Sequence, residues 1–275
     1  MSITLTSGMR QNLISLQQTS KLMELTQSRL ATGKRVQTAL DDPINFFAAQ
    51  NHQERANDLN FRKDAMGEAI QTIKAASNGI EAITDLIAAA KATAQSALSV
   101  DTSATTERSA LAAQFNTLRD KISDLAEDSG YKGINFLQSG NLTVSFNADG
   151  TNSIYLEGFN GCAGATATDG LRIEAAASNW AANTDIEAAI TDLDAAKTTL
   201  RTEAKELSSN LSIITARQDF TDKMINTLED GVANLTNADM NEEGANMLML
   251  QTRQALGTTS LSLASQAAQS VLRLF

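Results

Sequence analysis

The feature of this sequence that most constrains its fold is an apolar repeat of alternating three- and four-residue steps in its second half. The repeat begins at Ile186 and continues for seven heptads to Leu235, and twelve of its fifteen positions are apolar. Such a seam is typical of a helix that packs lengthwise against other helices, because apolar residues 3.5 positions apart stay on one side of a supercoiled helix. We therefore expect one long helix over roughly residues 184–236.

Two further seams lie in the first half. One runs without interruption through residues 69–97, and a shorter one runs through residues 111–125. Pro43 follows two aspartates and suits the first turn of a helix, where its missing N–H costs nothing. These patterns predict helices over roughly 44–98 and 105–128. Because single helices would expose their seams, we expect the three to form an elongated helical bundle or coiled coil, so the fold class is mainly α.

Composition argues against several classes of function. Aromatic residues are 4% of the chain and there is one proline, which is too little turn chemistry for a many-stranded β-sandwich. The formal net charge of −10 repels phosphates and argues against nucleic-acid binding. His52 is the single histidine and Cys162 the single cysteine, which leaves almost no ligands for a metal and no cysteine pair. We therefore expect no cofactor, no metal and no enzymatic activity.

Neither a membrane span nor a conventional export signal is predicted. The uncharged run 254–272 contains several Gln, Ser and Thr residues, which a lipid-embedded helix would not carry. Residues 1–8 contain no cation ahead of an apolar segment, as a secretory signal peptide requires. We expect no membrane insertion and no cleaved signal peptide.

The pattern changes between the helices. Leu142, Val144 and Phe146 alternate with polar residues, and an Asp-Gly pair separates them from the apolar run 154–156. This spacing predicts a small β-hairpin. We also expect a short strand at 171–173, and the whole stretch 141–183 as a surface insert.

The two ends of the chain form a matched pair. Residues 1–30 contain four charged residues, and residues 254–275 contain only Arg273. Each end carries an apolar stripe at helical spacing, and two such stripes exposed to water imply self-association. The stripes consist of Met9, Leu13, Leu16, Met23 and Leu30 at the first end and Leu261, Ala264, Ala268, Val271 and Phe275 at the second.

Several segments resemble the motifs of bacterial flagellins, in the same order and at both ends of the chain. The resemblance covers about residues 1–140 and 184–275. The segments are Leu30–Val36 (LATGKRV) with Ala39–Asp42 (ALDD), Gly130–Leu137 (GYKGINFL), Asn234–Asp239 (NLTNAD), and Gln254–Gly257 (QALG) with Ser270–Phe275 (SVLRLF).

The resemblance implies the structural subunit of a flagellar filament, a polymer that transmits motor torque for swimming. It implies that residues 1–42 and 237–275 pair as helices of an inner tube. Residues 43–140 and 184–236 then form the helical rod of an outer tube. The implied partners are other flagellin subunits, an export chaperone, the filament cap and hook-junction proteins. Export through the flagellar type III apparatus would make the protein secreted and extracellular, in the filament.

Residues between the N-terminal apolar stripe and the predicted helix 44–98 could belong to the polymerisation interface together with the two stripes. Arg35 with Asp41 and Asp42 could form an ion pair between subunits, or the carboxylates could simply cap a helix. Gly33 could be a joint between the tubes, an ordinary glycine at a helix C-terminus, or both.

Two alternatives stay open. A hook–filament junction protein would share the terminal helices and the rod. A cytosolic coiled-coil adaptor would explain the seams, although not the charge-poor ends.

Overall fold

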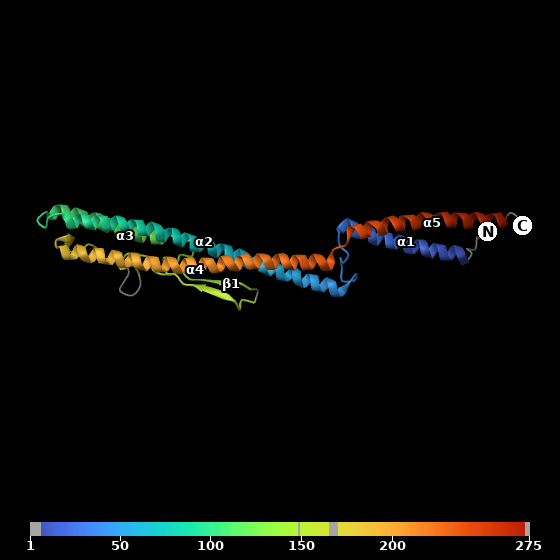
Figure 1. The fold of residues 1–275 in the computed structure, drawn as a ribbon, viewed down its shortest axis with the longest axis horizontal. Helices are drawn as coiled ribbons and strands as arrows, with labels where there is room; N and C mark the ends of the chain where they lie inside the picture. Colours follow the sequence, from blue (N-terminus) through green and yellow to red (C-terminus); the bar gives the residue numbers. More distant parts are fainter. Residues whose placement is uncertain (1–6, 148, 165–169, 273–275) are drawn as a thin grey trace. The chain divides into compact units, whose positions relative to one another are not determined.

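The computed structural model describes residues 7–147, 149–164 and 170–272. Helices dominate it, with a single hairpin among the described residues (Figure 1). The elements in chain order are α1 (Ser7–Thr32), α2 (Pro43–Ser99), α3 (Thr105–Asp128), β1 (Leu142–Ser145), β2 (Ser153–Leu156), the 3-10 helix η1 (Ala177–Trp180), α4 (Asn183–Thr236) and α5 (Met240–Leu272). The mainly α fold class and the three predicted long helices are confirmed.

The chain divides into two compact units. Residues 1–54 and 227–275 form one, which we call the terminal unit, and residues 55–226 form the other, the central unit. Helices α2 and α4 each contribute to both units.

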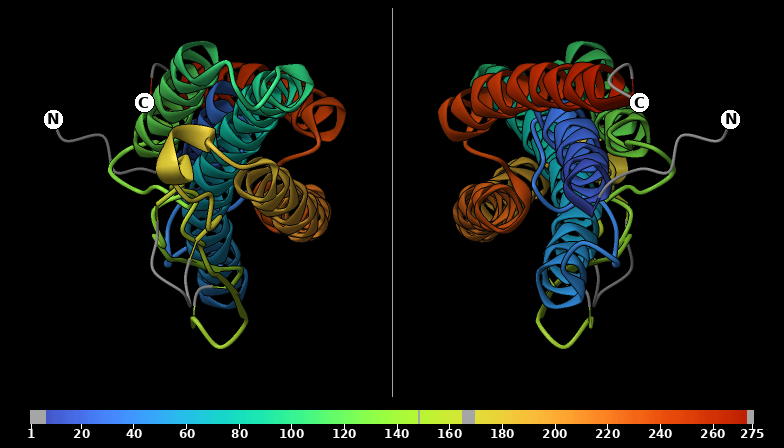
Figure 2. Two further views of the ribbon diagram at one scale, coloured as in Figure 1. Left: turned by 90° about the vertical axis from the view of Figure 1, so that its left-hand side faces the viewer. Right: turned by 90° about the vertical axis from the view of Figure 1, so that its right-hand side faces the viewer.

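In the central unit, α2 and α4 run antiparallel. Lys63 pairs with Asp222 at 3.0 Å near one end, whereas Lys91 pairs with Asp194 farther along α2. Helix α3 lies beside α2, as the end-on view shows (Figure 2). The three-helix arrangement that the seams predicted is therefore present in this unit.

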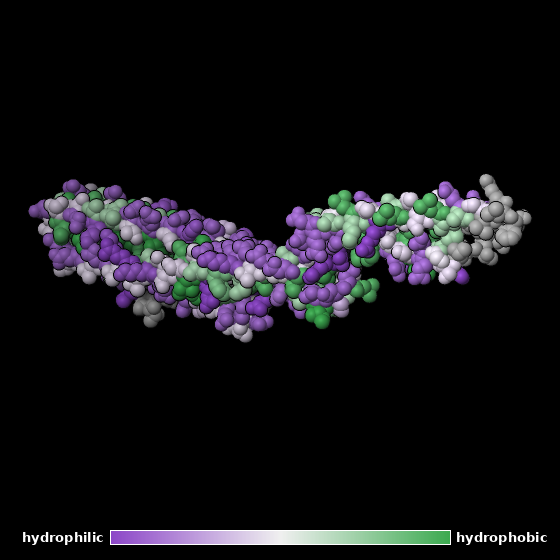
Figure 3. All heavy atoms as spheres, turned by 45° about the vertical axis from the view of Figure 1, so that its right-hand side comes forward, coloured by the Kyte–Doolittle hydropathy of each residue, from purple (hydrophilic) through white to green (hydrophobic). Residues whose placement is uncertain are grey.

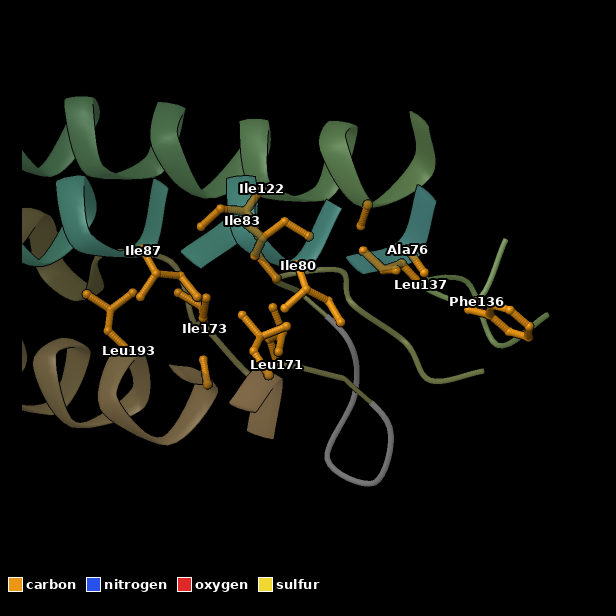
Figure 4. Close-up of a cluster of buried hydrophobic side chains, with 14 of the residues drawn as sticks. Ala76, Ile80, Ile83, Ile87, Ile122, Phe136, Leu137, Leu171, Ile173 and Leu193 are labelled. Carbon is orange, nitrogen blue, oxygen red and sulfur yellow. The ribbon is translucent and has the colours of Figure 1, made fainter. Parts of the chain in front are cut away.

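The predicted seams form the core of the bundle. All nine seam positions from Ala69 to Ala97 are buried, and none of the fifteen seam positions of α4 is exposed. Ile83 and Ile87 of α2 lie in one cluster with Ile122 of α3 and Leu193 of α4 (Figure 4). Burial of these apolar faces is the main stabilising contribution to a bundle of this kind.

Local signals at the start of α2 also act as predicted. Pro43 is the first helical residue, and the Oδ1 atom of Asp42 accepts a hydrogen bond of 3.1 Å from the backbone N–H of Asn45. This bond satisfies a donor that has no partner within the helix.

The hairpin lies where the sequence predicted it. Strands β1 and β2 are antiparallel, and Val144 is opposite Ile154. Val144 and Leu156 are buried on the inner face, whereas Thr143 and Tyr155 on the other face are exposed. The hairpin therefore covers part of the core with one face.

The predicted strand at 171–173 is wrong. Leu171 and Ile173 are buried and alternate with exposed Arg172, as in a strand, but Arg172 has a φ of +52°. The Ile173 carbonyl accepts a hydrogen bond of 2.9 Å from the side chain of Arg119 in α3. The backbone N–H groups of Leu171 and Ile173 donate to the carbonyls of Cys162 and Ala163, which belong to no strand, so the segment is irregular rather than part of a described sheet.

A buried arginine that the sequence did not reveal holds one end of the central unit together. Arg108 is 1% exposed, and its guanidinium donates to the carbonyls of Val100, Trp180 and Ala181 and to Oδ1 of Asn183. Trp180 is fully buried and packs against a phenylalanine of α3 with ring centroids 4.9 Å apart. Arg108 thereby ties α3 to the segment that leads into α4.

In the terminal unit, α1 packs along α5 (Figure 1). Asn12 of α1 donates a hydrogen bond of 2.9 Å to the hydroxyl of Ser260. At Gly257 the helices approach so closely that an added Cβ would lie 2.7 Å from Cδ2 of Leu16. Glycine at this position thus permits the close contact.

The linkers that follow α1 and precede α5 lie together in the same unit. The backbone N–H of Arg35 donates to the Thr236 carbonyl at 2.7 Å, and that of Ala238 donates to the Gly33 carbonyl at 2.9 Å. Gly33 has a φ of +69° and donates to the carbonyl of Arg29. It is therefore a left-handed residue that ends α1, as helix C-terminal glycines commonly are.

Candidate polymerisation surfaces

The predicted apolar stripe of α1 faces α5 of the same chain. Leu16 lies against Gly257, and Met9, Met23 and Leu30 share its face because they lie seven residues apart from one another along the helix. Met9 is 7% exposed and the other three are half-buried. Leu13 is 41% exposed and lies outside this packed face. Most of the stripe thus stabilises the helix pair within the chain.

A second apolar face on α1 was not predicted. Ile14, Leu22 and Leu25 are 54%, 49% and 40% exposed. Their spacings of eight and three residues put them on one side of the helix. Helix α1 is therefore apolar on two sides, and only one of them is covered by its own chain.

Helix α5 has the same two-sided character. Leu261 and Ala264, which belong to the predicted stripe, are half-buried. A different row, Met249, Leu256 and Leu263, lies at intervals of seven residues and is 45%, 65% and 62% exposed. The predicted Phe275 and the side chains of Ala268 and Val271 lie outside the described residues.

The exposed rows leave apolar side chains on the surface of both terminal helices. Hydrophobic residues are visible among the surface atoms of the terminal unit in the space-filling view (Figure 3). Scattered apolar residues are normal on protein surfaces, but rows that continue over several helical turns indicate a contact site. The row on α5 could have been predicted from its seven-residue spacing in the sequence.

An ion pair fastens the junction of α1 and α5. Arg29 lies in the last turn of α1, and its Nη1 is 2.9 Å from Oε1 of Glu243 in the first turn of α5. The Glu243 side chain is 9% exposed. A cation at a helix C-terminus and an anion at a helix N-terminus both complement the helix dipoles. Because the two residues are 214 positions apart in the chain, no local pattern in the sequence indicates this pair.

The predicted cluster of Arg35, Asp41 and Asp42 lies in the linker between α1 and α2. Asp41 accepts hydrogen bonds from the backbone N–H groups of Thr38 and Gln37, and these bonds lower the pKa of its carboxyl group. The backbone N–H of Asn45 lowers the pKa of Asp42 in the same way. Both aspartates thus serve as turn and cap residues within the chain, and a second role between subunits stays a prediction.

Arg35 has a different environment from the aspartates. Its side chain is exposed and forms no ion pair within the described ranges. Its backbone N–H anchors it to Thr236. A role for this side chain between subunits stays a prediction.

The described residues hold no group of three or more His, Cys, Asp and Glu side chains arranged for a metal. No described helix has the length and apolar character needed to cross a bilayer.

Two family models match this chain. The model of the bacterial flagellin N-terminal helical region matches residues 5–142, and the model of the bacterial flagellin C-terminal helical region matches residues 184–275. Together they cover both helical halves and leave out the hairpin insert. The chain belongs to the bacterial flagellin family.

Individual flagellins match over the full length. Flagellin FljO and flagellin FljM of Caulobacter vibrioides are each 30% identical over 100% of this chain and 98% of their own. A flagellin of Brucella melitensis is 27% identical over 100% of this chain and 99% of its own. The crystal structure of Bacillus cereus flagellin overlaps 57% of this chain and 88% of its own, with a TM-score of 0.48 and 16% identity.

This flagellin is a structural subunit of the flagellar filament and polymerises with other flagellin subunits. Its role is mechanical rather than catalytic, since flagellins are filament proteins and not enzymes.

Proposed function

We propose that this flagellin polymerises through the uncovered apolar faces of its terminal helices. The observation that carries the proposal is the row Met249, Leu256 and Leu263, which stays exposed although α5 is already packed against α1. Burial of such rows against neighbouring subunits would supply the favourable free energy of assembly. Residues 1–42 and 237–275 then form the inner tube, and the rod 43–140 with 184–236 forms the outer tube, with 141–183 as the surface insert.

The face of α1 that carries Met9, Leu16, Met23 and Leu30 has an indirect part in this scheme. It holds α1 and α5 together, and the pair presents its outward rows to neighbours. Leu13, Gly33, Arg35, Asp41 and Asp42 remain in the proposed interface because they are exposed or lie in the linker beside it.

Seeded polymerisation of purified subunits tests the proposal. In the double variant Leu256→Gln with Leu263→Gln, two side chains lose the apolar burial that assembly would give them. At about 1–2 kcal/mol for each leucine, the critical concentration should rise by at least about 30-fold. Far-UV circular dichroism of the monomer should stay unchanged, because both side chains are already in water.

The matched control is the double variant Thr258→Gln with Ser262→Gln, which changes two exposed polar positions on another side of α5. It should polymerise like the unaltered chain. A leucine variant that polymerises at the unaltered critical concentration would refute the proposed surface.

We also infer that the subunit is secreted through the flagellar type III apparatus and is extracellular. An export chaperone, the filament cap and the hook-junction proteins would be its further partners. Family membership supports this route. A strain that lacks a working flagellar export apparatus should retain the protein inside the cell, and normal release from such a strain would contradict the inference.

Sheared filaments test the filament-subunit assignment against the earlier alternative of a hook–filament junction protein, which would carry the same helical ends. Copy number separates the two. A filament subunit should be the abundant protein of sheared filaments, whereas a junction protein should be a trace component.

A further inference from the structure

The strongest exposure of large apolar residues in the terminal unit occurs where α2 begins. Leu40, Ile44 and Phe47 are 96%, 81% and 56% exposed. Ile44 and Phe47 share a face of α2 because they are three residues apart, and Leu40 lies in the linker just before it. We call these three residues the α2 patch.

The α2 patch lies beside a second aromatic ring and is bordered by negative charge. The ring of Phe47 meets that of Phe46 edge to face, with centroids 5.6 Å apart. Asp41 directly follows Leu40, is exposed, and has a lowered pKa because of its backbone hydrogen bonds, so it is ionised at neutral pH. An apolar patch with a carboxylate at its border fits a partner surface that is apolar and basic.

The central unit carries a surface of that kind on α4. Ile213 and Phe220 are 44% and 54% exposed, and Arg217 lies between them on the same helix face, at steps of four and three residues. The guanidinium of Arg217 lies 5.2 Å from the ring centroid of Phe146, and no carboxylate is paired with it in the described parts of the chain. We call these three α4 residues the α4 patch.

A polymer that grows without closing needs two different surfaces on each subunit. An interface in which the same patch meets itself ends in a closed dimer, whereas two unlike surfaces generate an open helix. The α2 and α4 patches are unlike in the required way, since one is bordered by a carboxylate and the other contains a guanidinium. Two copies of the α2 patch would instead bring like charges together.

We propose that the α2 patch of one subunit docks on the α4 patch of a second copy of this chain. The inference rests on the proposed function as a polymerising flagellin, and it names a contact apart from the terminal helix rows. Burial of Leu40, Ile44 and Phe47 against Ile213 and Phe220 supplies the apolar part of the contact. Asp41 and Arg217 fix its direction.

Crosslinking between two single-cysteine chains tests the contact. In a Cys162→Ser background, one chain carries Ile44→Cys and the other carries Phe220→Cys, and the two are copolymerised and treated with a short bismaleimide. Crosslinked dimers should form in mixed filaments, and neither chain should give them when polymerised alone. As a control, Thr215→Cys replaces Phe220→Cys, because position 215 is exposed on another side of α4.

A charge reversal gives an independent readout. Arg217→Glu places a carboxylate opposite Asp41 and should raise the critical concentration about tenfold or more at low salt. Arg201→Glu, at another exposed arginine of α4, changes the net charge equally and should leave it unchanged. Equal effects of the two reversals would overturn the inference.

The outcomes also separate the two proposals. Mixed filaments that form normally without crosslinks, although both thiols react in the monomers, overturn the docking of these patches and leave the terminal helix rows in place. If the double variant of Leu256 and Leu263 assembles normally and crosslinked dimers form, the docking of the α2 and α4 patches is supported. The proposed role of the terminal helix rows is then refuted.

Discussion

Replacement of Arg108 by methionine should destabilise the central unit strongly. The guanidinium is buried and donates to four acceptors, namely three backbone carbonyls and the side chain of Asn183. Arg108→Met keeps much of the aliphatic stem but removes every donor. In the folded variant these four oxygen atoms lose their donor, whereas in the unfolded chain water donates to them.

The magnitude follows from how many of these acceptors water can reach after the change. Ala181 and Asn183 are exposed residues, so water can replace the guanidinium there. The carbonyls of Trp180 and Val100 belong to a buried and a half-buried residue and stay largely without donors. At about 1–3 kcal/mol for each unsatisfied group, and with some loss of packing, we expect a loss of about 3–5 kcal/mol.

The single tryptophan gives a local assay. Trp180 is buried, and its carbonyl is one of the Arg108 partners, so its fluorescence reports unfolding at this site. Urea titration of the monomer should show a lower midpoint for Arg108→Met than for the unaltered chain. Arg201→Met, at an exposed arginine, should change the free energy of unfolding by no more than about 0.5 kcal/mol. A similarly small change for Arg108→Met would refute the argument that its donors hold this end of the bundle.

Three further changes test other parts of the structure. Gly257→Val should weaken the α1–α5 pair by about 1–3 kcal/mol, because its side chain would overlap Leu16, and Leu16→Ala should restore part of the loss in urea titrations. Burial, and to a smaller extent two neighbouring glutamates, raise the pKa of Glu203 above its ordinary 4.5. The charged carboxylate therefore destabilises the folded chain at pH values above the raised pKa, and this destabilisation is lost as the pH falls through it. Glu203→Gln should raise the urea midpoint at pH 7 and should leave it unchanged below pH 4.5. Backbone hydrogen bonds lower the pKa of Asp41 below its ordinary 3.8, so they stabilise the linker above pH 3.8 and are lost as the pH falls through the lower folded pKa. NMR titration of the Asp41 carboxyl group should give a midpoint below 3.8. A midpoint at or above 3.8 would contradict the observed geometry.

Much of the fold was predictable because its signals are local and periodic. The seam at residues 69–97 marks positions that are all buried, and Pro43 after Asp42 marks the start of α2. The position of the hairpin followed from the alternation at Leu142, Val144 and Phe146 and from the turn after them. These features depend on neighbours within a few residues, so no knowledge of distant contacts was needed.

The candidate site was predictable only in part. The sequence showed that the ends are apolar and charge-poor, but Leu16 and Ile14 look alike in a sequence. The structure separates them, since Leu16 packs on α5 and Ile14 stays 54% exposed. Arg108 was missed for a related reason: a charged residue is expected in water, and its acceptors at residues 180–183 are far away along the chain.

Periodicity and turn residues were enough to predict the long helices, the hairpin and the capacity for self-association, whereas the role of Gly33 was left open. Which apolar face packs inside the chain, and which remains open to other subunits, became known from tertiary packing alone. The physical reason is that a helical repeat specifies the direction in which an apolar side chain points, but not what covers it. Coverage depends on the pairing of α1 with α5, whose residues come from opposite ends of the chain.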